Sequence, residues 1–252
     1  KLVLQDVTPL SLGRSIVGDI MSVVIPRNTC IPVKKTRPYV TIEDNQSSST
    51  IAVYEGERTR ASDNNFLGSF ILSGHTLAPR GLPLDGERTR ASDNNLLGSF
   101  ILSGHTLAPR GHPLDVCFAI DENGILTVSA KEKCSGKMNE ITISNHKERM
   151  SAEEIKKLIK EAESYHVEDM KFLRKAEAVN ALDHYIYKMR NALKKKDINL
   201  KLSSQKIRKI ESAITVATNM LDEDHHHNDS HVLENHLKEL KIEFDYIIAK
   251  TI

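Results

Sequence analysis

The stretch VCFAIDENGILTVSA, residues 116–130, decides the fold class of the amino-terminal part of the chain. Val116, Phe118 and Ile120 alternate with other residues, so they share one face of a β-strand. Turn residues at 121–124 then lead into a second strand. The stretch therefore predicts a hairpin within an antiparallel β-sandwich or barrel.

The same pattern of short apolar runs extends over residues 2–145, where IMSVVIP, STIAVYEGE and LGSFILSG are separated by turn residues. At Met150 the apolar period changes from two to about 3.6, and Ser151 to Glu154 matches a capping box that begins a helix. We expect this helix to run to about Lys195 with a break near residues 166–169. Two more helices are expected, one from Ser203 and one over about 232–249. The fold class is α+β, with a β-sandwich at 9–148 and a helical bundle at 150–252.

A tandem duplication interrupts the sandwich, since residues 56–85 and 86–115 differ only at Phe66/Leu96 and Leu82/His112. Repeat architectures need at least three units, so two copies indicate a duplication inside a fold that uses one. The sequence after the repeat keeps its strand pattern, so we expect one copy to dock and the other to leave the sandwich as a long excursion. The sequence does not decide which copy docks.

The charge balance, 35 Lys and Arg against 34 Asp and Glu, gives no overall field that would attract nucleic acid or anionic lipid. No segment has the roughly 20 consecutive apolar residues of a membrane span. Neither nucleic acid nor a membrane is therefore an expected partner. Three well-separated cysteines without a C-x-x-C pattern are typical of reduced thiols and predict a cytoplasmic protein: Cys30, Cys117 and Cys134.

Motifs for catalysis are absent from the sequence, which has no phosphate-binding glycine loop, no G-x-S-x-G and no H-E-x-x-H. We therefore do not expect an enzyme. The tract DEDHHHNDSH, residues 222–231, has zinc or nickel ligands. Adjacent histidines between two helices are more often a solvated loop, so no metal site is predicted there or at the cysteines.

Several motifs together resemble the substrate-binding region of the seventy-kilodalton heat-shock chaperones, the heat shock protein 70 family: LVLQDVTPLSLG, IPRNTCIP, EDNQ, VYEGER, APRG, FAIDENGILTVSAKEK and ITISN. The resemblance implies that the sandwich binds unfolded or extended hydrophobic peptides and that the helices form a lid. In the family an upstream ATPase domain with ATP and Mg drives the cycle, and J-domain proteins are co-chaperones. That domain has no counterpart here, so no cofactor is expected in this chain.

The resemblance also assigns binding residues. Val17 and Ile42 match the pair that arches over the bound peptide, and the apolar lining matches Ile20, Val24, Tyr39, Ile51 and one of Leu84 or Leu114. Two positions depart from the family pattern, because Arg14 stands in place of an apolar residue and Ser49 in place of Val. We therefore expect peptide affinity about ten- to a hundredfold below the family's. By alternation alone, all of these residues are ordinary sandwich core.

A latch and a linker follow from the same resemblance. Asp183 on the lid matches a carboxylate that pairs with Arg80 or Arg110, and Asp44 matches a rim carboxylate that faces Tyr187. The alternative is that these are separate surface charges, and an exposed pair contributes only about 0 to 1 kcal/mol. Residues 1–8 match the interdomain linker through Leu2, Val3, Leu4 and Asp6, with Gln5 where the family usually has Leu.

Two other interpretations remain open at this level. The duplicated strand predicts an exposed apolar edge, which could leave a decayed fragment that has no function of its own. Alternatively, the helical half could act as a protein-interaction module without the sandwich.

Overall fold

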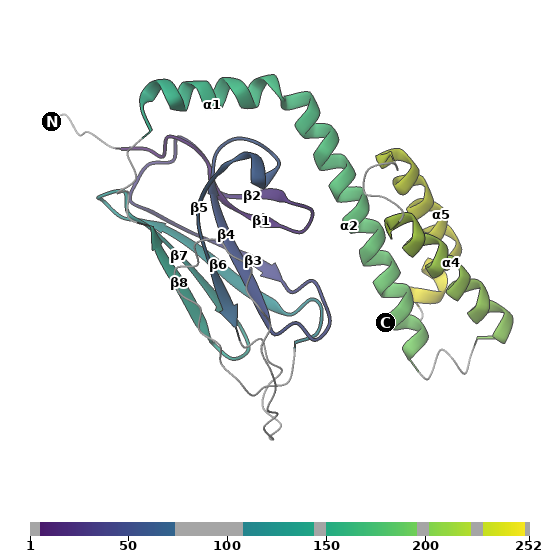
Figure 1. The fold of residues 1–252 in the computed structure, drawn as a ribbon. Coiled ribbons are helices and arrows are strands. Elements are labelled where there is room, and N and C mark those ends of the chain that lie inside the picture. Colours follow the sequence, from purple (N-terminus) through teal and green to yellow (C-terminus); the bar gives the residue numbers. More distant parts are fainter. Residues whose placement is uncertain (1–5, 74–107, 144–149, 196–201, 223–228, 250–252) are drawn as a thin grey trace. The chain divides into compact units, whose positions relative to one another are not determined.

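The computed structural model of the protein describes residues 6–73, 108–143, 150–195, 202–222 and 229–249 (Figure 1). Within these residues the chain forms two four-stranded antiparallel sheets, followed by four α-helices. The predicted α+β class is confirmed. Leu2, Val3 and Leu4 of the predicted linker lie outside the described residues, as do Arg80 and Leu84.

Each sheet combines strands that are consecutive in sequence with strands that are not. The first sheet has the order β2-β1-β4-β5, and its strands are β1 (Leu12–Ile16), β2 (Ile20–Ile25), β4 (Ser48–Glu55) and β5 (Asn65–Ser73). The second has the order β3-β6-β7-β8, and its strands are β3 (Val33–Val40), β6 (Pro113–Ile120), β7 (Leu126–Glu132) and β8 (Met138–Ile143). A 3-10 helix, η1 (Ala61–Asp63), lies between β4 and β5.

The predicted hairpin at residues 116–130 is present as β6 and β7. Ile120 pairs with Leu126, and the Asp121 carboxylate accepts hydrogen bonds from the backbone N–H groups of Asn123 (2.9 Å) and Ile125 (2.8 Å). Gly124 has a φ of 76°, a left-handed conformation that glycine adopts without strain. The hydrogen bonds of Asp121 and the conformation of Gly124 therefore fix the turn that aligns β6 with β7.

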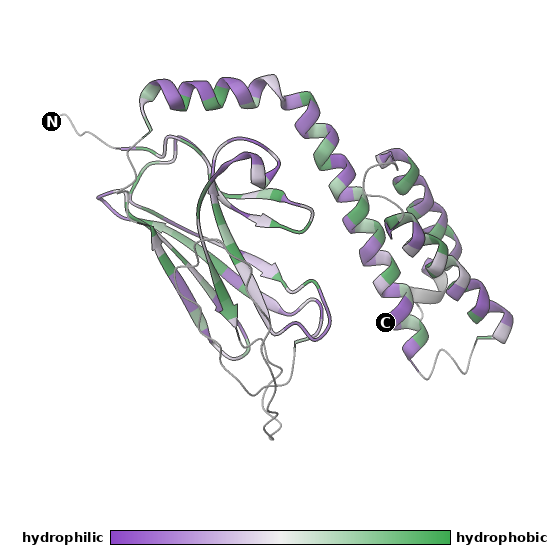
Figure 2. Cartoon of the chain, in the orientation of Figure 1, coloured by the Kyte–Doolittle hydropathy of each residue, from purple (hydrophilic) through white to green (hydrophobic). Residues whose placement is uncertain are grey.

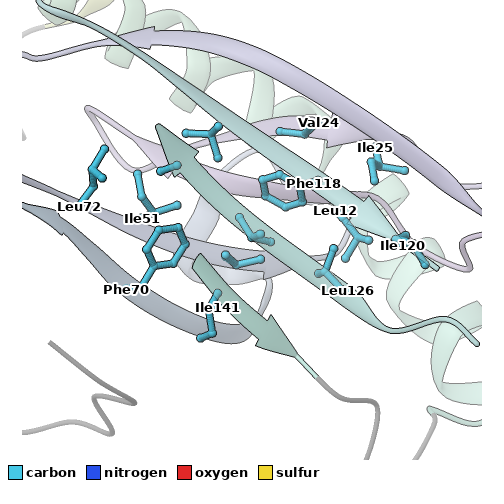
Figure 3. Close-up of a cluster of buried hydrophobic side chains, with 14 of the residues drawn as sticks. Leu12, Val24, Ile25, Ile51, Phe70, Leu72, Phe118, Ile120, Leu126 and Ile141 are labelled. Atoms are coloured by element: carbon cyan, nitrogen blue, oxygen red, sulfur yellow. The ribbon is translucent and has the colours of Figure 1, made fainter. Parts of the chain in front are cut away.

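The core lies between the two sheets. Phe70 and Ile51 from the first sheet face Phe118 and Leu126 from the second, and all four are buried (Figure 3). Buried apolar residues alternate with more exposed ones along β6 and β7, as expected for a sheet with one buried face, and both hydrophobic and hydrophilic segments are visible in the sheets (Figure 2). Asn139 on β8 also donates a hydrogen bond of 2.8 Å to the carbonyl of Ile71 on β5, which ties the edges of the two sheets together.

The two copies of the repeat supply different pieces of this sandwich. Strand β5 comes from the first copy and pairs with β4 from Ser48↔Ser73 to Glu55↔Asn65. Residues 108–115 of the second copy form the segment that enters β6. The apolar strand of the second copy lies outside the described residues. The sequence did not decide which copy docks; the structure shows that the first copy provides the strand that pairs with β4.

The helices begin and end close to the residues predicted from the sequence. Helix α1 (Ala152–Ser164) begins with the capping box, in which Glu154 N–H donates to Ser151 Oγ at 3.2 Å and the Glu154 carboxylate accepts from Ser151 N–H at 2.7 Å. The predicted break lies at Tyr165, between α1 and α2. The remaining helices are α2 (His166–Lys194), α4 (Ser204–Asp222) and α5 (Ser230–Ala249). Over the described residues, none of these helices is both long and apolar enough to span a bilayer.

The chain divides into two compact units, Lys1–Val167 and Glu168–Ile252. Helix α1 is part of the first unit, where the Arg58 guanidinium lies 4.3 Å from the ring centroid of Tyr165. The second unit has its own core of residues from α2, α4 and α5, which includes Leu182, Ile186, Met189, Ile214 and Leu233.

Deletion of residues 78–107 should stabilise the first unit. The deletion joins β5 of the first copy to the end of the second through GHTL, so the connection between Ser73 and Ala108 falls from 34 residues to 4. Loop closure then costs about 2 kcal/mol less, at roughly 0.6 kcal/mol for each doubling of length. Urea denaturation should show this increase in the free energy of unfolding. A decrease would mean that residues 74–107 contribute stabilising structure of their own.

Candidate functional site

Two aliphatic side chains that the resemblance assigns to the arch are exposed on loops of the sandwich. Val17 lies in the turn between β1 and β2 and is 41% exposed, and Ile42 follows β3 and is 45% exposed. An aliphatic side chain gains free energy when a ligand removes it from water. Both positions are therefore suited to contact an apolar partner, and their arch role stays a prediction.

The predicted lining residues that the structure describes are largely buried in the sandwich. Their exposed fractions are 9% for Ile20, 2% for Val24, 0% for Ile51 and 1% for Leu114. Tyr39, on β3, is partly buried against the same cluster and pairs in register with Leu114. A ligand could therefore contact most of these side chains only after neighbouring residues move, and their lining role stays a prediction.

Arg14 joins four strands at this end of the sandwich. Its guanidinium carbon lies 4.6 Å from the ring centroid of Tyr39, its Nε donates to the Ser15 carbonyl at 3.1 Å, and a terminal nitrogen donates to the Thr50 carbonyl at 3.4 Å. The Tyr39 hydroxyl in turn lies 3.0 Å from Ser22 Oγ on β2. The surroundings of Tyr39, one of the predicted lining residues, thus include a stacked cation and the Ser22 hydroxyl.

The charge of Arg14 is poorly compensated. The residue is 9% exposed, and among the described residues it forms no ion pair. Burial lowers the pKa of its guanidinium, and the neighbouring Tyr39 opposes that shift. Carbonyl oxygens and a ring face stabilise a cation less than a carboxylate does, so we expect the Arg14 charge to lower the free energy of unfolding.

Gln46 fixes the loop that presents Ile42. Its Oε1 accepts hydrogen bonds from the N–H groups of Ile42 (2.9 Å) and Glu43 (3.3 Å), and its Nε2 donates to the Ser48 carbonyl and to Ser49 Oγ, both at 2.8 Å. Ser49 is thereby a partner of the loop anchor. The Gln46 backbone also exchanges two hydrogen bonds with Ala108, of 3.1 and 3.3 Å.

Thr41 connects the same loop to the end of the second repeat copy. This buried residue donates from Oγ1 to the Pro109 carbonyl at 2.7 Å and accepts at Oγ1 from His112 N–H at 2.9 Å. Its own backbone N–H donates to the His112 carbonyl, also at 2.9 Å. We call the two paired segments, residues 41–47 and 108–112, the rim. The rim therefore depends on the second copy of the repeat.

The predicted latch residues are distributed over both compact units. Asp44 and Arg110 meet on the rim, where the Arg110 backbone N–H donates to Asp44 Oδ1 at 3.0 Å. Asp183 and Tyr187 lie on α2 in the second unit, so their pairing across units stays a prediction. Of the predicted linker, Asp6 is described, and its carbonyl accepts a hydrogen bond of 2.9 Å from Ile31 N–H.

Sequence reasoning did not identify Gln46 and Thr41 as positioning residues. The signal was present in part, because a polar residue in a short loop between two strands often satisfies backbone groups. The specific partners of Thr41 could not be inferred, since they lie about 70 residues away along the chain and belong to the repeat.

Comparison with known proteins gives a consistent match. The family model described as Hsp70 protein matches residues 1–84 and 83–252, two segments that meet inside the repeat. A heat shock 70 kDa protein of Neurospora crassa is 40% identical over 224 residues, which are 89% of this chain and 30% of that protein. Heat shock cognate 70 kDa protein 3 of Dictyostelium discoideum is 39% identical over 84% of this chain and 29% of its own length. The chain thus spans about 30% of the length of these relatives.

Replacement of the buried cation should increase stability. Arg14→Met keeps a long flexible side chain and removes a desolvated charge, so we expect the free energy of unfolding to rise by about 1 kcal/mol. Arg14→Lys is the matched control, because it retains a charge but loses the planar stacking on Tyr39, and it should be less stable than the parent chain. Urea denaturation measures both. A destabilised Arg14→Met variant would show that stacking and hydrogen bonding outweigh desolvation.

Proposed function

This chain belongs to the Hsp70 protein family, and we propose that it acts as a chaperone by binding extended hydrophobic segments of unfolded polypeptides to its β-sandwich. The observation that carries the proposal is the pair of exposed aliphatic side chains, Val17 and Ile42, on loops of a sandwich that has a buried apolar core. An extended peptide would add backbone hydrogen bonds, which give affinity with little demand on sequence.

The geometry of the rim supports reversible binding. Gln46 and Thr41 hold the loop that bears Ile42, and their hydrogen bonds to residues 108–112 must loosen for the apolar lining to reach a peptide. Individual hydrogen bonds of this kind contribute about 0.5 to 1.5 kcal/mol, so loosening of a few of them is compatible with opening at ordinary temperatures.

The remaining parts of the proposal concern the whole protein. The helices at 150–252 would form a lid, with Asp183 and Tyr187 as the lid residues of a latch to the rim. ATP and Mg would act in a separate ATPase domain, and J-domain proteins would be co-chaperones, as the family resemblance implies. We also propose a cytoplasmic location, which the reduced state expected for the three thiols supports.

Loss of the two exposed aliphatic groups should weaken peptide binding. The double variant Val17→Ser, Ile42→Ser removes apolar contact from both loops, so we expect the Kd of a fluorescein-labelled Leu-rich peptide to rise at least tenfold. Both residues are exposed, so the fold should persist. The matched control is Ile242→Ser, which removes a 78% exposed side chain on α5 and should leave the Kd unchanged. Equal affinity of the double variant and the parent in fluorescence anisotropy would contradict the proposed site.

Removal of the Arg14 charge should strengthen binding of the same peptide. Arg14→Met restores an apolar wall beside Tyr39, and the expected decrease in Kd is about tenfold. Arg58→Met is the matched control, because Arg58 also stacks on a tyrosine but lies at Tyr165, away from the rim. If both variants bind as the parent does, Arg14 does not contact the peptide.

A further inference from the structure

Three potential metal ligands of different chemical type converge at one corner of the second sheet. His112 directly precedes β6, Glu132 ends β7, and Cys134 lies in the turn that leads to β8. Their ligand atoms, a ring nitrogen, a carboxylate oxygen and the thiol sulfur, all lie within 4.8 Å of one another. The register pair Leu114↔Glu132 and a hydrogen bond of 3.3 Å from Lys133 N–H to the Pro113 carbonyl bring the two segments together.

The carboxylate and the imidazole of this cluster are buried against each other. Glu132 is 0% exposed and His112 is 5% exposed, and His112 Nε2 lies 2.5 Å from Glu132 Oε1. The Glu132 carboxylate therefore lies in a site that excludes most water, and the His112 ring nitrogen is aimed at it.

Cys134 gives this buried pair an opening to solvent. Its backbone N–H donates to Glu132 Oε1 at 2.6 Å, so the cysteine stays next to the carboxylate, while its side chain is exposed. The backbone N–H of Ser135 donates to the other carboxylate oxygen. These bonds fix the turn, and the exposed Cys134 side chain can rotate to bring its sulfur closer to the carboxylate. An ion can reach the cluster from that side.

The repeat supplies an internal comparison. The first copy has Leu82 at the position that corresponds to His112, and this is one of only two differences between the copies. The docked segment comes from the second copy, which has the imidazole. A leucine in this place would leave the buried Glu132 without one of its hydrogen-bond donors.

We propose that His112, Glu132 and Cys134 bind one Zn²⁺ ion, with water as a fourth ligand on the exposed side. Nitrogen, oxygen and thiolate donors in a tetrahedral arrangement suit zinc. Zinc–ligand bonds of about 2.0 to 2.3 Å require the ligand atoms to lie about 3.3 to 3.8 Å apart. Nε2 and Oε1 therefore separate by about 1 Å as the ion takes the place of the proton between them. That proton moves to Nδ1 of the His112 ring, which stays neutral, and the Cys134 thiol releases its proton to solvent.

The experiment uses the full chain with His225, His226 and His227 replaced by Asn, because that tract has potential zinc ligands of its own. Reduced, chelator-treated protein is titrated with Zn²⁺ by calorimetry and with Co²⁺ by absorption spectroscopy. We expect one ion per chain and a thiolate-to-cobalt charge-transfer band. Cys134→Ser should weaken zinc binding at least tenfold and abolish the band, whereas Cys30→Ser, which alters another exposed cysteine, should change neither.

His112→Leu completes the test, since it places the first copy's residue at the site. It should weaken zinc binding at least tenfold, and circular dichroism checks its fold. If this variant does not fold, Cys134→Ser decides, because that substitution is exposed and changes one atom. Absence of a one-to-one zinc complex, or equal binding by Cys134→Ser and Cys30→Ser, would overturn the assignment. Peptide binding is a separate readout, so failure here leaves the proposed chaperone function untouched.

Discussion

Strand β4 has one hydrogen-bonding edge available for a neighbour beyond β1, and this edge determines how the sandwich uses a duplicated sequence. The first copy provides β5 because only nine residues, 56–64, separate it from β4, so the two strands pair after closure of a short loop. Asn64 reinforces that loop, since its side-chain amide donates to the carbonyls of Arg58 and Arg60, both at 2.8 Å. The first copy's strand therefore has an entropic advantage over the corresponding sequence of the second copy, which lies 30 residues further along the chain and differs from it only at Phe66/Leu96.

The same constraint explains why the second copy is still needed. Strand β6 begins at Pro113. Residues 108–112 directly precede this strand, so its position in the second sheet places them at the rim. Thr41 and Gln46 then bond to residues of the second copy. The first copy contributes β5, which follows β4 closely in sequence, and the second copy contributes the residues that lead into β6. The sandwich therefore combines parts of both copies into the equivalent of one.

Local features of the fold could be predicted from the sequence, whereas features that depend on pairing between distant segments could not. The turn at Asp121 to Gly124 and the capping box at Ser151 depend on neighbours within five residues. The sequence could not predict that the first copy provides β5 and the second copy provides the start of β6, because the two copies are almost the same. Arg14 was recognised as a departure from an apolar pattern, but its place over Tyr39 depends on the packing of one sheet on the other. The cluster around Glu132 gave no motif, because 20 residues of sequence separate His112 from it.

His112 belongs to both the proposed zinc site and the rim, which makes the two sites thermodynamically linked. Its ring faces Glu132, while its backbone N–H and carbonyl both bond to Thr41, at 2.9 Å each. If the ion fixes the ring, the backbone of residue 112 loses freedom, and separation of the rim becomes more costly. By reciprocity, a peptide that requires an open rim would then weaken zinc binding by the same factor as zinc weakens peptide binding. One of the two substitutions that distinguish the repeat copies, Leu82/His112, thus lies where a change in one side chain can alter how readily the rim opens.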